Sequence, residues 1–157
     1  MGKNSVANLP RTRSLIAVDT NILVYAHRED SKWHLPAVRS IDLLASEKSS
    51  WAIPWPCIHE FLSVVTHPKI YRPATPLGNA LEQIDIWLES RLELLTETPP
   101  YWHSLKSLLQ AGRIEGPQVH DARIAALCET YAVSELWTAD RDFGKFPKLK
   151  IRNPMVG

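Results

Sequence analysis

The sequence predicts an α/β fold with a mostly parallel central sheet of about five strands flanked by helices. Two observations predict it. Short apolar segments alternate along the chain with longer segments of helical periodicity, and the first apolar segment, residues 15–18, contains no polar residue. A continuous apolar run is typical of a strand buried on both faces, as the strands of parallel sheets are. Alternation of such strands with helices favours parallel pairing through crossover helices.

Length and composition indicate one ordinary domain, because the chain has 157 residues, of which 45% are hydrophobic and 22% charged. We expect a polar, loosely ordered leader at residues 1–14 and a single domain over residues 15–157. No apolar run approaches the roughly 18 residues of a membrane helix, so we expect a cytoplasmic protein. Cys57 and Cys128 are too few for a disulfide or zinc framework, and we expect both to be buried as small hydrophobic residues.

In the first half of the chain, the apolar segment 15–18 leads into Asp19-Thr20-Asn21, which are good helix-capping residues. Prolines then mark helix starts and ends, because proline suits the first turn of a helix and interrupts its interior. In order, we expect a helix from Ile22, a helix from Pro36, a strand at 51–53, and a helix from Pro56 that ends before Pro68.

The second half repeats the alternation. The segment 71–76 holds two prolines and predicts a loop. In the helix expected at 77–88, one face carries Leu77, Leu81, Ile84 and Leu88. In order, the remaining expected elements are a strand at 92–95, a helix from Pro99 to Gly112, a helix from Gly116 to Tyr131, a strand at 135–138 and a strand at 149–151.

Two of the predicted strands end in an aspartate. The segment 15–18 is followed by Asp19, and the segment 136–139 is followed by Asp140, with Asp142 two residues further on. A single aspartate after a strand is usually a helix cap. Two in one small domain indicate a shared site, because ligands of parallel sheets bind beyond the carboxyl ends of the strands, at a topological switch point.

A third carboxylate, Asp121, comes from the predicted helix 117–131. It lies three and four residues before Ile124 and Ala125, and therefore on the side of the helix that faces the core. A charge there is costly unless it is paired, bound to a metal or at the mouth of a cleft. Pairing with a neighbour such as Arg123 or His120 is the plain alternative, but Arg123, two positions away on the helix, points elsewhere.

Glu60 is the fourth candidate, although helical periodicity alone places it near the margin of the apolar face and favours an exposed glutamate. Carboxylates that converge at strand ends repel one another and raise each other's pKa. A hard divalent cation such as Mg²⁺ removes this repulsion, prefers oxygen ligands, and activates water for attack on phosphate esters. Because the sequence contains neither GxxxxGK[ST] nor GxGxxG, a nucleotide-binding fold is disfavoured.

Four motifs in this order resemble the PIN-domain family and, within it, the VapC-type toxins of bacterial toxin–antitoxin pairs. The matching segments read AVDTNILVYA at 17–26, EFLSVV at 60–65, HDARIAA at 120–126 and TADRDF at 138–143. With their spacing they cover residues 15–153. The resemblance implies a PIN-like three-layer sandwich and a Mg²⁺- or Mn²⁺-dependent endoribonuclease, the toxin of a type II pair. It further implies an RNA substrate, a cognate antitoxin protein and a homodimer.

The resemblance also implies a set of site residues. The family's catalytic acids match Asp19, Glu60, Asp121 and Asp140. The metal ligands among them match Asp19, Asp121 and Asp140. Three supporting positions match Asn21, which would brace the first acid, Thr138, a small hydroxyl residue near the site, and Asp142, an additional acid.

The charge distribution indicates where RNA would bind. The net charge is +1, but residues 141–157 carry five basic side chains and one acidic side chain, a net charge of +4. We expect Lys145, Lys148 and Lys150 to contact phosphates, the alternative being a solvated tail. The alternative function is a catalytically inactive PIN-like module that binds RNA or protein, which the presence of all four acids disfavours. A phosphatase with an aspartyl nucleophile is also disfavoured, because Asn21 stands where that chemistry usually has a second aspartate.

Overall fold

The computed structural model describes residues 14–46 and 50–156, and within them the predicted parallel α/β fold is confirmed. Five strands form one sheet in the order β3-β2-β1-β4-β5, and all neighbouring strands pair in parallel. The strands are β1 (Ile16–Val18), β2 (Trp51–Pro54), β3 (Leu92–Leu95), β4 (Glu135–Trp137) and β5 (Ile151–Arg152). The expected strand at 149–151 thus lies slightly later in the chain. Of the leader expected at 1–14, residues 1–13 lie outside the described residues.

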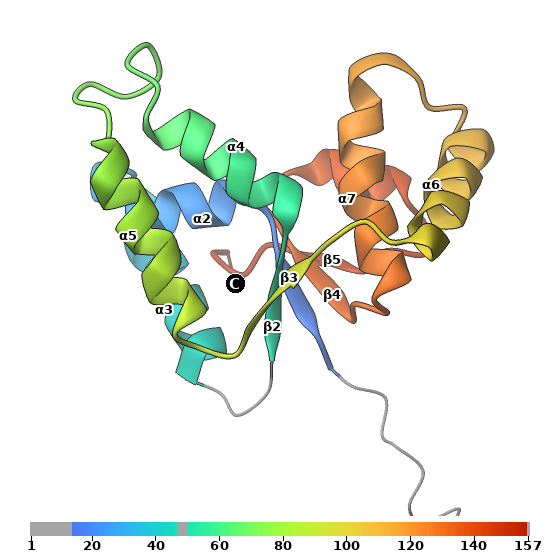
Figure 1. The fold of residues 1–157 in the computed structure, drawn as a ribbon, viewed down its shortest axis with the longest axis horizontal. Coiled ribbons are helices and arrows are strands. Elements are labelled where there is room, and N and C mark those ends of the chain that lie inside the picture. The colour runs from blue at the N-terminus through green and yellow to red at the C-terminus, as the bar shows by residue number, and fades with distance from the viewer. Residues whose placement is uncertain (1–13, 47–49, 157) are drawn as a thin grey trace, which may run out of the picture.

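Helices cover the sheet on both sides and make three layers. In Figure 1, α2, α3 and α5 lie on one side of the sheet and α6 and α7 on the other, while α4 leaves the carboxyl end of β2. The helices of the described residues are α2 (Thr20–His27), α3 (His34–Ser46), α4 (Trp55–Val65), α5 (Leu77–Leu88), α6 (Pro99–Gly112) and α7 (Val119–Thr130). Two short 3₁₀ turns add η1 (Gly116–Gln118) and η2 (Arg141–Lys145).

The strand order fixes where a site can form. From β1 the chain proceeds to β2 and β3 on one side, and then returns to place β4 on the other side of β1. The direction of winding therefore reverses between β1 and β4, which is the topological switch point of the sheet. Asp19 directly follows β1, and Asp140 lies three residues after the end of β4. Both aspartates therefore lie at the switch point.

The core explains why β1 and β2 are continuously apolar. Ala17, Val18 and all four residues of β2 are buried, because helices cover both faces of the central strands. Both cysteines are buried and free, as expected. None of the helices in the described part of the chain is long and apolar enough to span a membrane.

Some expectations about helices are wrong in detail. The first helix begins at Thr20, two residues before Ile22, and the helix expected from Gly116 begins as the 3₁₀ turn η1 before α7. The second helix begins at His34, two residues before Pro36, which still lies in its first turn. The face expected to bury α5 is mostly exposed: Leu77, Leu81 and Leu88 are 61%, 46% and 43% exposed. Instead α5 buries Ala80 and Trp87, and the Trp87 ring packs against Phe61 of α4 with a centroid distance of 5.1 Å.

Candidate active site

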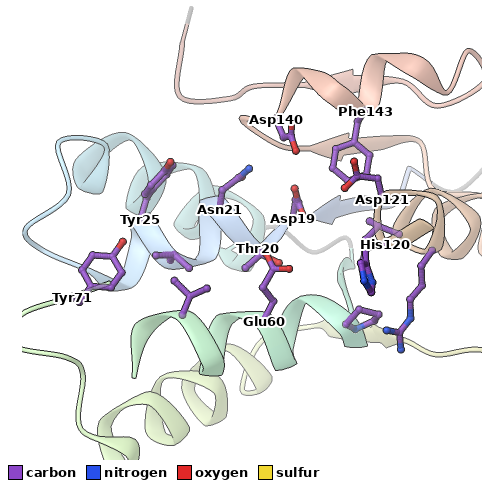
Figure 2. A pocket seen from close by; sticks show the side chains of 15 residues that line it. Asp19, Thr20, Asn21, Tyr25, Glu60, Tyr71, His120, Asp121, Asp140 and Phe143 are labelled. Carbon is purple, nitrogen blue, oxygen red and sulfur yellow. The ribbon is translucent and has the colours of Figure 1, made fainter. Parts of the chain in front are cut away.

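A cavity of about 370 Å³ opens at the carboxyl ends of β1 and β4. It is lined by the four acids that the sequence predicted as catalytic, which are Asp19, Glu60, Asp121 and Asp140. Figure 2 shows Asp140 and Asp121 toward one end of this cavity and Tyr25 and Tyr71 toward the other, with Asp19 and Glu60 between them. The structure therefore gathers side chains that are up to 121 positions apart in the chain.

Asp19 is the most buried of these acids. It directly follows β1, and its backbone N–H donates to the Trp137 carbonyl at 2.9 Å, which ties it to β4. Its side chain accepts hydrogen bonds from the Thr138 hydroxyl at 2.8 Å and from the Cys57 thiol at 3.5 Å. Burial raises the pKa of Asp19 above its usual value, and the hydrogen bond from Thr138 opposes that rise.

Thr138 connects the two strand ends. Its hydroxyl oxygen donates to Asp19 and accepts from the Asp140 backbone N–H at 3.0 Å and from the Asn21 side-chain amide at 3.3 Å. The Asn21 side-chain carbonyl in turn accepts from the Ala139 N–H at 3.2 Å. Asn21 thus contacts the first acid through Thr138 and not directly. These bonds hold the start of α2 and the segment after β4 in one arrangement.

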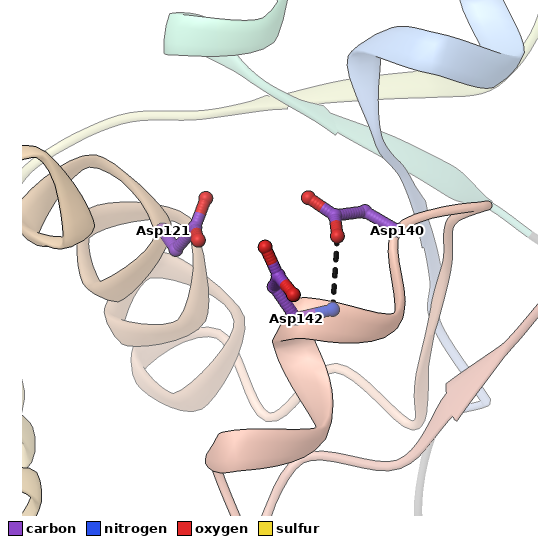
Figure 3. A group of neighbouring side chains, drawn as sticks. All are labelled: Asp121, Asp140 and Asp142. Carbon is purple, nitrogen blue, oxygen red and sulfur yellow. Dashed lines mark hydrogen bonds between the residues drawn. The ribbon is translucent and has the colours of Figure 1, made fainter.

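Three carboxylates form a tighter group at the edge of this cavity. Asp121, Asp140 and Asp142 each offer one oxygen, and these oxygens all lie within 4.8 Å of one another (Figure 3). The Asp142 N–H donates to the Asp140 side chain at 2.9 Å, so that Asp140 caps η2 and orients both residues. Asp121 enters from the first turn of α7, where the helix dipole favours a negative charge.

The membership of this group differs from the ligand set that the resemblance implies. Asp142, which the sequence placed in a supporting position, belongs to it, whereas Asp19 lies outside it in the adjoining cavity. Every donor in the group is a carboxylate oxygen. Such a set suits a hard divalent cation and is a poor match for zinc or copper, which favour imidazole and thiolate.

The charged neighbours of Asp121 decide whether it pairs with Arg123. Arg123 donates to Glu97 at 2.8 Å and does not pair with Asp121, as its position on the helix predicted. The cation that pairs with Asp121 is Lys145, whose ammonium group lies 3.0 Å from Asp121 Oδ2. Sequence reasoning missed this pair, because the two residues are 24 positions apart on different elements and no local pattern joins them.

Glu60 projects from α4 and lines the cavity opposite the strand ends, although it is exposed as helical periodicity predicted. It adds to the negative potential that raises the pKa of Asp19, after larger contributions from burial. An exposed position on a helix and a place in the cavity wall are therefore compatible. Helical periodicity alone does not reveal that wall, because the rest of it comes from other elements: α2, α7, the loop before α5 and the segment that follows β4.

The other end of the cavity is aromatic and was not singled out from the sequence. Tyr25 of α2 and Tyr71 of the loop before α5 line it. The Arg28 guanidinium lies 4.3 Å from the centroid of the Tyr71 ring, and also pairs with Asp30. Tyr71 is only partly buried, so it presents ring surface at the mouth of the cavity.

The three lysines predicted to contact RNA occupy different places. Lys145 ends η2 beside the acids. Lys148 is exposed in the loop between η2 and β5. Lys150 pairs at 3.1 Å with Glu135, the first residue of β4, and therefore lies at the amino end of the sheet, opposite the cavity.

Comparisons with known proteins agree with this fold. A family model described as PIN domain matches residues 16–149. The chain is 29% identical to the VapC ribonuclease Mb2897 of Mycobacterium bovis over 147 residues, which covers 91% of this chain and 97% of the relative. It is 26% identical to ribonuclease VapC48 of Mycobacterium tuberculosis, over 88% of this chain and 97% of that protein.

Solved structures share the fold at lower identity. The crystal structure of VapBC2 from Rickettsia felis, bound to a DNA fragment from their promoter, contains a chain that matches with a TM-score of 0.62 and 22% identity. That match covers 88% of this chain and 97% of the other. VapC20 of Mycobacterium tuberculosis, described as a toxin that cleaves the Sarcin-Ricin loop, matches with a TM-score of 0.57 and 21% identity, over 82% and 92% of the two chains.

Proposed function

The chain belongs to the PIN domain family, and from this premise we propose that it is a metal-dependent endoribonuclease, the toxin of a toxin–antitoxin pair. The observation that carries the proposal is the gathering of Asp19, Glu60, Asp121 and Asp140 in one cavity at the switch point of a parallel sheet. The relatives named as VapC ribonucleases match over nearly their whole length, which supports the same activity here.

Mg²⁺ or Mn²⁺ is the cation that fits the donor set. Asp121, Asp140 and Asp142 would hold it. Asp19 lines the adjoining cavity together with Asp121 and Asp140 and would contribute through a bridging water. When bound, such a cation supplies a hydroxide-like nucleophile near neutral pH and neutralises charge on the phosphate. The absence of a thiolate fits this assignment, since burial raises the pKa of Cys57 well above its usual value and keeps that thiol neutral.

The protein's own groups have distinct tasks in this proposal. Thr138 fixes the orientation of the Asp19 carboxylate and of the Asp140 backbone at the same time. Asn21 holds Thr138 in place and ties the start of α2 to the segment after β4. Glu60 lies on α4, apart from the group of Asp121, Asp140 and Asp142, and is available to accept a proton from water.

The cavity also suits a single-stranded RNA. Tyr25 and Tyr71 offer aromatic surface at one end, and stacking on such rings accepts any base. Lys145 supplies positive charge beside the acids for the phosphate backbone. Lys148 is a further exposed lysine, in the loop that follows η2. This combination of stacking surface, cations and carboxylates favours RNA hydrolysis over the alternative of a catalytically inactive binding module.

A cognate antitoxin and a second copy of the chain are the proposed protein partners. The names of the solved relatives, which include VapBC complexes from Rickettsia felis and Salmonella typhimurium, support an antitoxin. The exposed leucines of α5 and Leu35 and Leu43 of α3 provide apolar surface for such contacts.

The experiment that tests the function compares cleavage of a single-stranded RNA in Mg²⁺ by the wild type and Asp121→Asn. We expect the substitution to lower kcat by about 100-fold or more, because it removes charge from the group that stabilises the reacting phosphate. Asn has the shape of Asp, so circular dichroism should show an unchanged fold. Cleavage at the wild-type rate by Asp121→Asn would refute the assignment, and an inactive wild type in Mg²⁺ and Mn²⁺ would favour the binding module. Asp42→Asn, on the exposed surface of α3, is the matched control.

A further inference from the structure

A lysine ammonium group lies against the acid cluster formed by Asp121, Asp140 and Asp142. The Lys145 Nζ donates to Asp121 Oδ2 at 3.0 Å, and the two side chains are 27% and 29% exposed. Lys145 is the last residue of η2, the same turn that begins after Asp140 and contains Asp142. One short turn thus carries both part of the acid cluster and a cation that faces it.

Charge makes this contact significant. When ionised, the three carboxylates place three negative charges within 4.8 Å, and Lys145 contributes one positive charge at their edge. A divalent cation would contribute two. An ammonium group and a divalent cation on the same carboxylate repel each other, so a bound divalent cation weakens the contact between Lys145 and Asp121.

We propose that Lys145 is the internal counter-cation of the acid cluster: it binds Asp121 in the metal-free protein, leaves Asp121 when a divalent cation binds, and then contacts a phosphate of the RNA. The proposal rests on the proposed function for the identity of the metal and the phosphate. It assigns to one side chain two successive partners, a carboxylate and then a phosphate.

The local structure allows the side chain to move without the backbone. Phe143 and Phe146 lie on either side of Lys145 in the chain and are 2% and 3% exposed, so that η2 is anchored in the core. The lysine itself has a flexible four-carbon stem that ends in three rotatable donors. The ammonium group can therefore leave Asp121 by rotation of side-chain bonds alone.

Two consequences distinguish a counter-cation from a merely exposed lysine. Removing its charge should strengthen metal binding, because the cation then displaces no ion pair. A partly exposed ion pair changes affinity by no more than about fivefold. Removing its charge should also weaken the coupling between metal and phosphate, because no ammonium group is released when the metal binds.

The test titrates Mn²⁺ into metal-free protein by calorimetry at low salt. We expect Lys145→Gln to bind Mn²⁺ about two- to fivefold more tightly than the wild type, and Lys145→Arg and Lys148→Gln to bind like the wild type. Lys148 is the matched control, since it is an exposed lysine three positions further along. Unchanged or weaker Mn²⁺ binding by Lys145→Gln would overturn the inference.

Asp121→Asn separates failure of the inference from failure of the site. If Asp121→Asn weakens Mn²⁺ binding while Lys145→Gln equals the wild type, the metal site stands and the role of Lys145 falls. If Asp121→Asn binds Mn²⁺ like the wild type, the metal assignment itself falls, and the inference with it.

A second titration tests the transfer to phosphate, with adenosine monophosphate as the probe because it has no phosphodiester bond to cleave. We expect Mn²⁺ to increase the affinity of the wild type for the nucleotide more than that of Lys145→Gln. An equal gain in both proteins would show that Lys145 does not pass from Asp121 to phosphate.

Discussion

Burial of the Asp19 carboxylate reduces the stability of the folded protein. It is 8% exposed, and burial raises its pKa above its usual value in spite of the hydrogen bond from Thr138. A raised folded-state pKa stabilises the protein below the unfolded pKa of about 3.9, and that contribution is lost as the pH rises through the folded pKa. Burial of the Asp19 carboxyl group therefore lowers the stability of the metal-free protein at neutral pH relative to acid pH.

Because burial raises the pKa of Asp19, we predict that Asp19→Asn is more stable than the wild type at pH 7 without metal. The difference in stability should shrink as the pH falls toward 4. Asn keeps an oxygen that can accept the Thr138 hydroxyl and carries no charge to bury. Urea unfolding in EDTA at several pH values measures the difference. A constant difference across the pH range would show that burial of charge at Asp19 is not its cause.

A site residue can be predicted from the sequence only where its neighbours in the chain mark its position. Asp19 and Asp140 follow apolar strands, so the carboxyl ends of the strands reveal them. The hydrogen bond from Thr138 to Asp19 and the ion pair of Lys145 with Asp121 span 119 and 24 positions. Only the assembled sheet brings such pairs together, and no periodicity within one element predicts them.

At the scale of elements, α5 shows how two apolar faces compete on one helix. Leu77, Leu81 and Leu88 make a face with helical spacing, but Ala80 and Trp87 make another, and the second one packs on α4. The small Ala80 allows close approach, and the large Trp87 ring fills the space beside Phe61. Sequence periodicity cannot choose between two such faces, because the choice depends on the shape of the partner helix.

We predict opposite outcomes for the two faces of α5. Trp87→Ala should lower the free energy of unfolding by about 3–5 kcal/mol, because it leaves a cavity in the core. Leu81→Gln should change it by less than about 0.5 kcal/mol, since Leu81 is already exposed. Urea unfolding at low protein concentration measures both values. Similar losses for the two variants would contradict the packing of α5.

If the exposed face of α5 serves the proposed homodimer, its substitution should act on association. Leu81→Gln should then shift the sedimentation of the protein toward the monomer while the Asp42→Asn control does not. If Leu81→Gln does not change the sedimentation of the protein, the exposed leucines of α5 take no part in dimer formation.

At the scale of the whole molecule, the alternation of strands and helices sufficed to predict a parallel sheet, but not the order of its strands. That order places β1 between β2 and β4 and so creates the switch point where the acids meet. Charge follows the same geometry. Acidic groups converge at the carboxyl ends of the strands, whereas the basic residues of 141–157 extend from that edge to the opposite one, where Lys150 pairs with Glu135.

This arrangement predicts which lysines contribute to RNA binding. In EDTA, where a metal-dependent enzyme does not cleave, log affinity for single-stranded RNA should fall with log salt at about −0.7 per phosphate contact. Lys148→Gln should flatten that slope by about 0.7, because Lys148 is exposed in the loop that follows η2. Lys150→Gln should leave it unchanged, because Lys150 pairs with Glu135 at the far end of β4. Filter binding over a range of salt concentrations measures both slopes. Equal flattening by the two variants would mean that RNA also crosses the amino ends of the strands, away from the acids, and an unaltered slope in both would make this segment a solvated surface.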